Sequence, residues 1–412
     1  MSFFRSRWVD VPDGVAEAAV PGLPAGFRAA GVAAGVKPSG GRDVGLLVAD
    51  APATTSAARF TRSGVLAAPV LLTRERSRLD ALRAVAVNAG NANAATGAAG
   101  LEAAARMQAA AGAAAGVATE QVAVASTGVI GVPLDADAVV AGLERAADEL
   151  RADGDADLQA AIMTTDAFEK RAALDVELTG GAVRLCAQAK GAGMIQPAFA
   201  TMLCFVQTDA ALEVATADLL LGVCVKRSFD RISVDGQLST NDTAILMASG
   251  AAGVAVAPES EDELRFGQAL DALLRQLALE IVRDGEGARR TGRVLVRGGH
   301  SGHVEGAARA VANSPLVKAA LHGADPNWGR IAQAVGAALP GTAPLPVDIA
   351  IEGAQLCVAG AAVGADLAAL APAVARDEVE YVVGLPGDGH ETEVFFSDLG
   401  HEYVTINAQY TT

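Results

Sequence analysis

Aromatic residues are scarce in this chain. They make up 4% of its 412 residues, whereas hydrophobic residues as a whole make up 51%. The core must therefore be built mainly from Ala, Val and Leu, and the length is enough for two or three domain-sized units. The 45 glycines fall in clusters without a fixed period. This excludes a collagen-like chain and indicates many tight turns.

Cysteine and histidine are also rare. The four cysteines are far apart and form no Cys-x-x-Cys pair: Cys186, Cys204, Cys224 and Cys357. Two of them lie in apolar runs, which favours buried, reduced thiols in a cytosolic protein. Among the five histidines, only His300 and His303 form an H-x-x-H pair, and no third ligand accompanies them. We therefore expect no metal site.

Long apolar stretches and an excess of positive charge are both missing. The first residues, MSFFRSRWVD, lack the continuous apolar segment of a signal peptide. No uncharged apolar stretch reaches the roughly 18 residues that a transmembrane helix needs. The formal net charge of −16 disfavours nucleic acid and anionic membranes as partners and favours a cationic amine as substrate. We expect a cytoplasmic protein that acts on small molecules.

Short apolar runs alternate with helical patterns along the chain. In the first half, buried strands are predicted at 44–50, 65–72, 84–88 and 122–126, and helices at 101–115 and 136–151. In the second half, we predict strands at 202–208, 346–351, 379–385 and 402–408, and helices at 261–284 and from Ser314-Pro315 to Gly323. Because no linker of disordered composition separates the halves, we expect one packed α/β body.

The segment KGAGMIQPAFATMLCFVQTDA, residues 190–210, brings a hydroxyl to the start of an apolar strand. If the bond between Ala200 and Thr201 is broken, Thr201 carries both a hydroxyl and a free α-amine. A terminal amine of near-neutral pKa can accept the hydroxyl proton, which makes the threonine a nucleophile. The alternative is that Thr201 stands there only because threonine favours strands.

A second segment, VAVASTGVIG at 122–131, ends a predicted strand with Ser126, Thr127 and Gly128. A hydroxyl and turn N–H groups at a strand end are the donors that a developing oxyanion needs. An ordinary glycine turn is the competing interpretation.

Several motifs of different kinds follow one another in a recognisable order. They are GFRAAGVAAGVKPSGGRDVGLLVAD (26–50), NAGNANAATG (88–97), ASTGVIG (125–131), IMTTD (162–166), KGAGMIQP (190–197), ATML (200–203), STNDT (239–243), DGEGA (284–288), SPLVKAALHGADPNWGRI (314–331) and SDLGHEYVTINAQYTT (397–412). With these motifs the chain resembles the ornithine acetyltransferase family, the bifunctional glutamate N-acetyltransferase and amino-acid acetyltransferase of arginine biosynthesis. The resemblance extends from about residue 26 to Thr412.

The resemblance implies a layered α/β sandwich of the N-terminal-nucleophile-like type, not a doubly wound parallel sheet. Two self-cleaved fragments, 1–200 and 201–412, would build it jointly. Two copies of each fragment would then assemble into a heterotetramer.

The resemblance also assigns the reaction. Thr201 would take an acetyl group from N2-acetylornithine and pass it to glutamate, in a ping-pong reaction through an acetyl-threonine ester. Thr127 and Gly128 match the family's oxyanion pair. The substrate-binding positions are Thr164, Lys190, Thr201, Glu286, Asn407 and Thr412. Thr165 competes with Thr164 for its role. No cofactor is implied, and acetyl-CoA is a second candidate donor.

The sequence departs from the family just before the cleavage site. Ala198 and Phe199 stand where the family usually has Asn-Met, and Arg289-Arg290 stand where it has Thr-Lys. These changes keep other interpretations open. One is a self-processing amidohydrolase or aminopeptidase with an N-terminal threonine, one is a paralogue acting on a related acylated amino acid in secondary metabolism, and one is a paralogue that does not cleave and only binds a metabolite.

Overall fold

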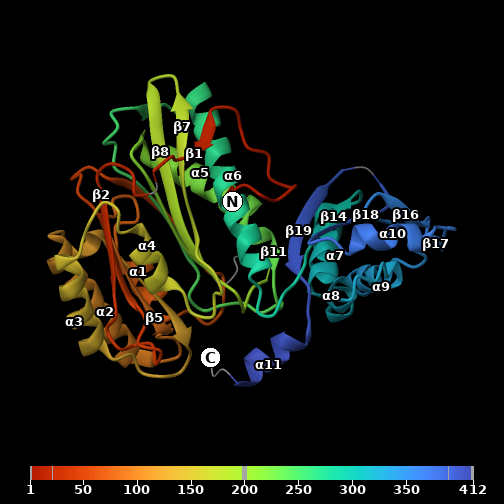
Figure 1. The fold of residues 1–412 in the computed structure, drawn as a ribbon, viewed down its shortest axis with the longest axis horizontal. Coiled ribbons are helices and arrows are strands. Elements are labelled where there is room, and N and C mark those ends of the chain that lie inside the picture. Colours follow the sequence, from red (N-terminus) through yellow and green to blue (C-terminus); the bar gives the residue numbers. More distant parts are fainter. Residues whose placement is uncertain (1, 21, 197–201, 388, 410–412) are drawn as a thin grey trace.

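A computed structural model describes residues 2–20, 22–196, 202–387 and 389–409. Within these ranges, two β-sheets face each other and carry helices on both outer sides. A second α/β unit, made by the C-terminal third of the chain, lies beside this sandwich (Figure 1).

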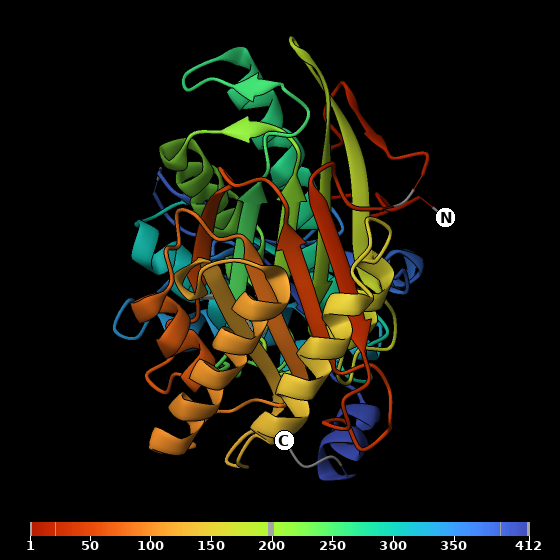
Figure 2. The same cartoon turned by 90° about the vertical axis from the view of Figure 1, so that its left-hand side faces the viewer.

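The first sheet of the sandwich has four strands in the order β2-β3-β5-β6. Its strands are β2 (Phe27–Val32), β3 (Val44–Ala49), β5 (Ala84–Asn91) and β6 (Val122–Val129). Three helices cover its outer face (Figure 2): α1 (Ala68–Arg76), α2 (Gly97–Ala115) and α3 (Ala136–Asp148). The core between sheet and helices is rich in Ala, Val and Leu, as the shortage of aromatics predicts.

The second sheet has six strands in the order β1-β7-β8-β9-β12-β4. Its strands are β1 (Val15–Glu17), β7 (Lys170–Leu178), β8 (Gly181–Lys190), β9 (Leu203–Thr208), β12 (Thr243–Ala248) and β4 (Thr55–Phe60). Its outer face packs against α5 (Val214–Arg227) and α6 (Glu261–Arg283). Residues such as Phe27, Val87 and Phe205 from the two inner faces form the core between the sheets. The helix α4 (Asp155–Ile162) packs against strands of both sheets.

The C-terminal unit is built on a seven-stranded sheet with its own hydrophobic core. The sheet order is β11 (Ile232–Ser233), β19 (Glu391–Ser397), β14 (Thr291–Arg297), β18 (Glu378–Gly384), β15 (Asp348–Ile351), β16 (Ala354–Val358) and β17 (Ala361–Ala362). The accompanying helices are α7 (Ser301–Asn313), α8 (Pro315–His322), α9 (Trp328–Ala338) and α10 (Leu367–Val374). A small pair, β10 (Ala211–Leu212) with β13 (Ala255–Val256), and the terminal helix α11 (His401–Gln409) complete the fold.

The two halves of the chain share one sheet. β8 ends at Lys190, β9 begins at Leu203, and these two residues are paired in antiparallel register. Strands on either side of the predicted cleavage site are therefore neighbours, which agrees with one packed body. A separate core in the C-terminal unit was not expected from the sequence.

Most predicted elements are confirmed, and side chains cap two of the predicted helices. The Ser260 side chain accepts the N–H of Glu263 at the start of α6, and Ser314 accepts that of Val317 at the start of α8. In the DPNWGR motif, Asn327 caps α9, and Trp328 packs against the C-terminal core. All four cysteines are buried and free.

Two predicted strands are wrong. Residues 65–72 belong largely to α1, because Pro69 sits in the first turn of a helix, where its missing N–H costs nothing. Residues 402–408 lie in α11, which buries none of its residues and pairs with no strand. Short apolar runs fit either kind of element, so periodicity alone could not separate them. None of the helices in the described ranges is long and apolar enough to cross a membrane.

Candidate active site

Lys190 lies at the carboxyl end of β8 and is almost completely buried. Its partner across the sheet is Leu203, so the start of β9 lies beside it. Met202 is the first described residue after the predicted cleavage site. Its N–H donates to Asp242 Oδ1 (3.0 Å), and Thr243 N–H donates to its carbonyl (3.1 Å). The chain that follows Thr201 is thus fixed from both sides.

Thr127 and Gly128 lie near the carboxyl end of β6, where the strand runs parallel to β5. Gly128 has φ +130°, and a Cβ atom there would stand 2.3 Å from the carbonyl carbon of Gly90. Only glycine fits this close approach of two backbones. The turn is held from the other sheet, because the Asn241 amide donates to the Ser126 carbonyl (2.8 Å). Since Asn241 precedes Asp242, one segment holds both the predicted oxyanion pair and the start of β9.

The Lys190 ammonium connects two of the predicted site hydroxyls. Its Nζ donates to Thr164 Oγ1 (2.7 Å) and to Thr127 Oγ1 (3.2 Å). Of the two candidate hydroxyls in the IMTTD motif, Thr164 is the one that Lys190 contacts directly. Burial lowers the pKa of Lys190 from its ordinary value, and Asp166 opposes that shift.

Asp166 lies behind Lys190 and is fully buried. Its Oδ2 is 3.9 Å from Lys190 Nζ, and its Oδ1 accepts the N–H of Gly191 (2.8 Å). Burial by itself would raise the pKa of Asp166, but Lys190 and Lys170 bring it below the ordinary range. A carboxylate in this position favours the charged form of the lysine and opposes the effect of burial.

Glu286 and Asn407, two more of the predicted binding residues, contact each other. Asn407 Nδ2, from α11, donates to Glu286 Oε2 (2.7 Å). Gly193 makes room for this carboxylate, because a Cβ atom there would be 2.9 Å from Glu286 Cδ. The charge of Glu286 also raises the pKa of Lys190, so the two groups are electrostatically coupled. One end offers a cation and the other an anion, which suits a zwitterionic ligand.

Several predicted site residues fall outside the described part of the chain. These are the cleavage pair Ala200 and Thr201, the preceding Ala198 and Phe199, and Thr412. Their roles remain predictions from the sequence.

Sequence reasoning missed three residues that support the site. Asp166 stands inside IMTTD, and Asn241 and Asp242 inside STNDT, but only Thr164 was singled out from these motifs. Each is nine-tenths or more buried. Burial raises the pKa of Asp242 well above its ordinary value. Their place inside motifs of the family was a signal that could have drawn attention to these polar residues. Their burial, which shows that they support the site, cannot be predicted from one sequence.

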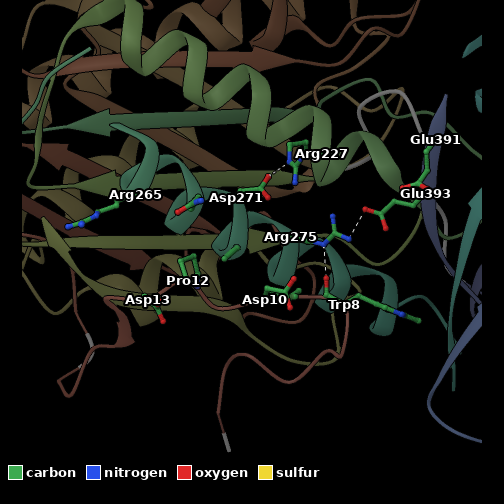
Figure 3. Close-up of a pocket in the computed structure, with 13 residues that line it drawn as sticks. Trp8, Asp10, Pro12, Asp13, Arg227, Arg265, Asp271, Arg275, Glu391 and Glu393 are labelled. Carbon is green, nitrogen blue, oxygen red and sulfur yellow. Dashed lines mark hydrogen bonds and ion pairs between the residues drawn. The ribbon is translucent and has the colours of Figure 1, made fainter. Parts of the chain in front are cut away.

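The structure also contains a polar hollow of about 780 Å³ between the N-terminal segment and α6 (Figure 3). Its three arginines are already paired: Arg227 with Asp271 (2.9 Å), Arg265 with Glu261 (2.7 Å) and Arg275 with Glu393 (2.6 Å). None of the predicted site residues lines it. Among the described residues, no group of three or more His, Cys, Asp or Glu side chains is arranged to hold a metal ion.

The fold and the site together define a class of protein. An α/β sandwich that gathers hydroxyls, a buried ammonium and a glycine turn at its strand ends has the donors that acyl transfer requires. Comparison with known proteins specifies the class further: the profile of the ArgJ family matches residues 28–412, and the chain belongs to this family.

Relatives cover nearly the whole chain. A protein of Symbiobacterium thermophilum named Arginine biosynthesis bifunctional protein ArgJ is 45% identical over 393 residues, which is 94% of this chain and 98% of the relative. A protein of the same name from Geobacter sulfurreducens is 43% identical, covering 94% of this chain and 99% of its own. The solved ornithine acetyltransferase of Mycobacterium tuberculosis, complexed with ornithine, is 38% identical with a TM-score of 0.42, covering 46% of this chain and 99% of that one.

Proposed function

We propose that this protein is a self-cleaving acetyltransferase of arginine biosynthesis that moves an acetyl group from N2-acetylornithine to glutamate. Membership of the ArgJ family supports the reaction. The observation that carries the proposal is the contact of the Lys190 ammonium with the hydroxyls of Thr127 and Thr164. Lys190 pairs with Leu203 on the neighbouring strand, so these groups lie beside the chain that follows Thr201.

In the first half-reaction, the Thr201 hydroxyl attacks the acetyl carbonyl of N2-acetylornithine. The α-amine of Thr201 takes the hydroxyl proton, and the Thr127 hydroxyl and Gly128 N–H bind the negative oxygen of the tetrahedral intermediate. The C–N bond then breaks, ornithine leaves with the proton, and an acetyl ester remains on Thr201. In the second half-reaction, the amine of glutamate attacks this ester and regenerates the hydroxyl.

The two charged parts of the site orient the substrates. Lys190 binds the substrate carboxylate, with Thr164 beside it, and Glu286 binds the ornithine ammonium. Asn407 holds the Glu286 side chain, and Thr412 closes the site as the chain end. The opposite charges of Lys190 and Glu286 select an amino acid over a simple acid or amine.

The same nucleophile cuts its own chain. Attack of the Thr201 hydroxyl on the Ala200 carbonyl gives an ester, and water hydrolyses it to fragments 1–200 and 201–412. Because β8 and β9 are paired along their length, the fragments stay together after the cut. We propose a cytoplasmic heterotetramer of two copies of each fragment, with no bound cofactor and with acetyl-CoA as a second donor.

The test is a comparison of the purified protein with a Thr201→Ala variant. The wild type is expected as two bands with transfer from N2-acetylornithine to glutamate, and the variant as one inactive band. An uncut wild type with full transfer activity would refute the mechanism. Acetate release that does not depend on glutamate would instead identify an amidohydrolase.

A further inference from the structure

A row of four buried charges runs behind the candidate site. In order, it contains Asp284, Lys170, Asp166 and Lys190, and their side chains are between 0% and 4% exposed. Lys170 Nζ is 2.7 Å from Asp166 Oδ1 and also bonds Asp284 Oδ2. The charges alternate, so the row as a whole is neutral. Lys190, at its end, binds the hydroxyls of Thr127 and Thr164, while Asp166 Oδ2 accepts the Thr164 backbone N–H (3.0 Å).

We propose that Lys170 is a positioning residue for Lys190. Its ammonium balances the negative charge of Asp166. The Lys190 ammonium therefore stays hydrogen-bonded to the hydroxyls of Thr127 and Thr164 and remains available to the substrate carboxylate. This inference rests on the proposed function, in which Lys190 binds that carboxylate. Among the described residues, the Lys170 ammonium bonds Asp166, the Phe168 carbonyl and Asp284 but neither Thr127 nor Thr164, so it acts through Asp166.

The distances within the row support this assignment. Asp166 is 2.7 Å from Lys170 but 3.9 Å from Lys190, so its close ion pair is with Lys170. Lys190 in turn makes its shortest contact, 2.7 Å, with Thr164. If Lys170 were neutral, Lys190 would be the nearest cation to Asp166 among the described residues, with Lys37 acting on it from farther away. In a buried site this attraction is strong, and it would draw the Lys190 ammonium away from the hydroxyls.

Lys170 is held firmly enough for such a role. Besides its two carboxylate partners, its ammonium lies 5.0 Å from the centre of the Phe168 ring. Asp284 is fixed by the N–H of Ala167 (3.0 Å). Asp284 also lies two residues before Glu286, so the row ties the cationic part of the site to the anionic part. If the chain is cut before Thr201, the Lys170–Asp284 pair joins the two fragments.

The electrostatic surroundings of Lys190 give a readout that needs no substrate. The titratable groups that act on it are Asp166, Lys170, Glu286, Asp242 and Lys37. Lys170 lowers the pKa of Lys190, and Asp166 raises it. Loss of Lys170 should therefore raise the pKa of Lys190. The chain has only five lysines, so lysine side-chain NMR can resolve this titration.

The experiment compares Lys170→Met with a matched control on the same strand. Arg171→Met also removes a cation from a buried carboxylate, because Arg171 Nη1 is 2.6 Å from Asp155 Oδ2, but it leaves the row intact. We expect Lys170→Met to raise the pKa of Lys190 and to increase KM for N2-acetylornithine on the order of tenfold, as expected when one charge-assisted hydrogen bond to the substrate is weakened. Arg171→Met should change neither quantity.

A double variant separates positioning from simple stabilisation. Lys170→Met with Asp284→Asn removes an ion pair and keeps the row neutral, so the thermal stability lost in Lys170→Met should recover. The raised KM and the raised pKa of Lys190 should persist, because Lys190 is still the nearest described cation to Asp166.

An unchanged Lys190 titration in both variants, or a KM that recovers together with stability, would overturn the proposal. A wild type without transfer activity would refute the proposed function. The NMR titration of Lys190 would still test whether Lys170 positions it, because that measurement needs no substrate.

Discussion

Replacing Thr127 with Val tests the assignment of the oxyanion pair. Val has the same shape and suits a strand, and Thr127 lies within the regular pairing of β6 with β5. The change removes one hydroxyl, and Lys190 keeps its shorter contact with Thr164. The fold and the position of Lys190 should therefore be preserved.

The expected loss is kinetic. Removing one of two oxyanion donors costs about 2.7–4 kcal/mol of barrier, or roughly 10²–10³ in kcat. Both half-reactions pass through a tetrahedral intermediate, so acetylation by N2-acetylornithine and deacetylation by glutamate should slow together. Single-turnover kinetics with each substrate measures the two steps separately, and KM should change little.

Thr73→Val provides the matched control. The Thr73 hydroxyl is also buried and also bonds β6, donating to the Val124 carbonyl (3.0 Å). This variant should lose some stability and keep its rates. If Thr127→Val retained a kcat within about threefold of the wild type, Thr127 would not be an oxyanion donor.

Three further results are expected. Gly128→Ala should lower both kcat and thermal stability, because its Cβ would collide with the Gly90 backbone; a stable, fully active variant would contradict the close approach. Glu286→Gln should raise KM for N2-acetylornithine at least about tenfold, since a hydrogen bond to a charged group contributes about 1.5–3 kcal/mol, and calorimetry with ornithine measures the same loss; unchanged affinity would remove Glu286 from the site. Burial lowers the pKa of Lys318 from its ordinary value of 10.5 to about 7. Between these two pH values, Lys318 is protonated in the unfolded chain but not in the folded chain. The free energy of unfolding should therefore rise with pH across this range. Lys318→Met should lack that part of the rise in denaturation measured across this range, and an identical slope in both proteins would show that Lys318 titrates normally.

The sequence predicted part of the framework that carries the site. The strand β6, which carries Thr127, was predicted because its apolar run is continuous and buried, so its polar end stands out. The strand β8, which ends at Lys190, was not predicted, because Arg184 and Gln188 interrupt its apolar residues. The run at 65–72 was ambiguous, because Pro69 can begin a helix as well as interrupt a strand. The terminal helix α11 has no apolar face, and its contacts with Glu286 and Asp235 come from the tertiary structure.

The buried charges could not be predicted in the same way. Lys190 and Glu286 were chosen through the family resemblance, whereas Lys170 carries no motif of its own. Its position depends on pairing between β7 and β8, in which Lys170 faces Ala189, next to Lys190. Its contact with Asp284 joins residues 114 positions apart. Such long-range ion pairs leave no local pattern in a single sequence.

The most direct test of the account is the intact mass of the two fragments after incubation with N2-acetylornithine alone. The account predicts fragments 1–200 and 201–412, with one acetyl group on the N-terminal threonine of the second fragment, lost again on addition of glutamate. A single uncut chain, or an acetyl group on any residue other than Thr201, would contradict it.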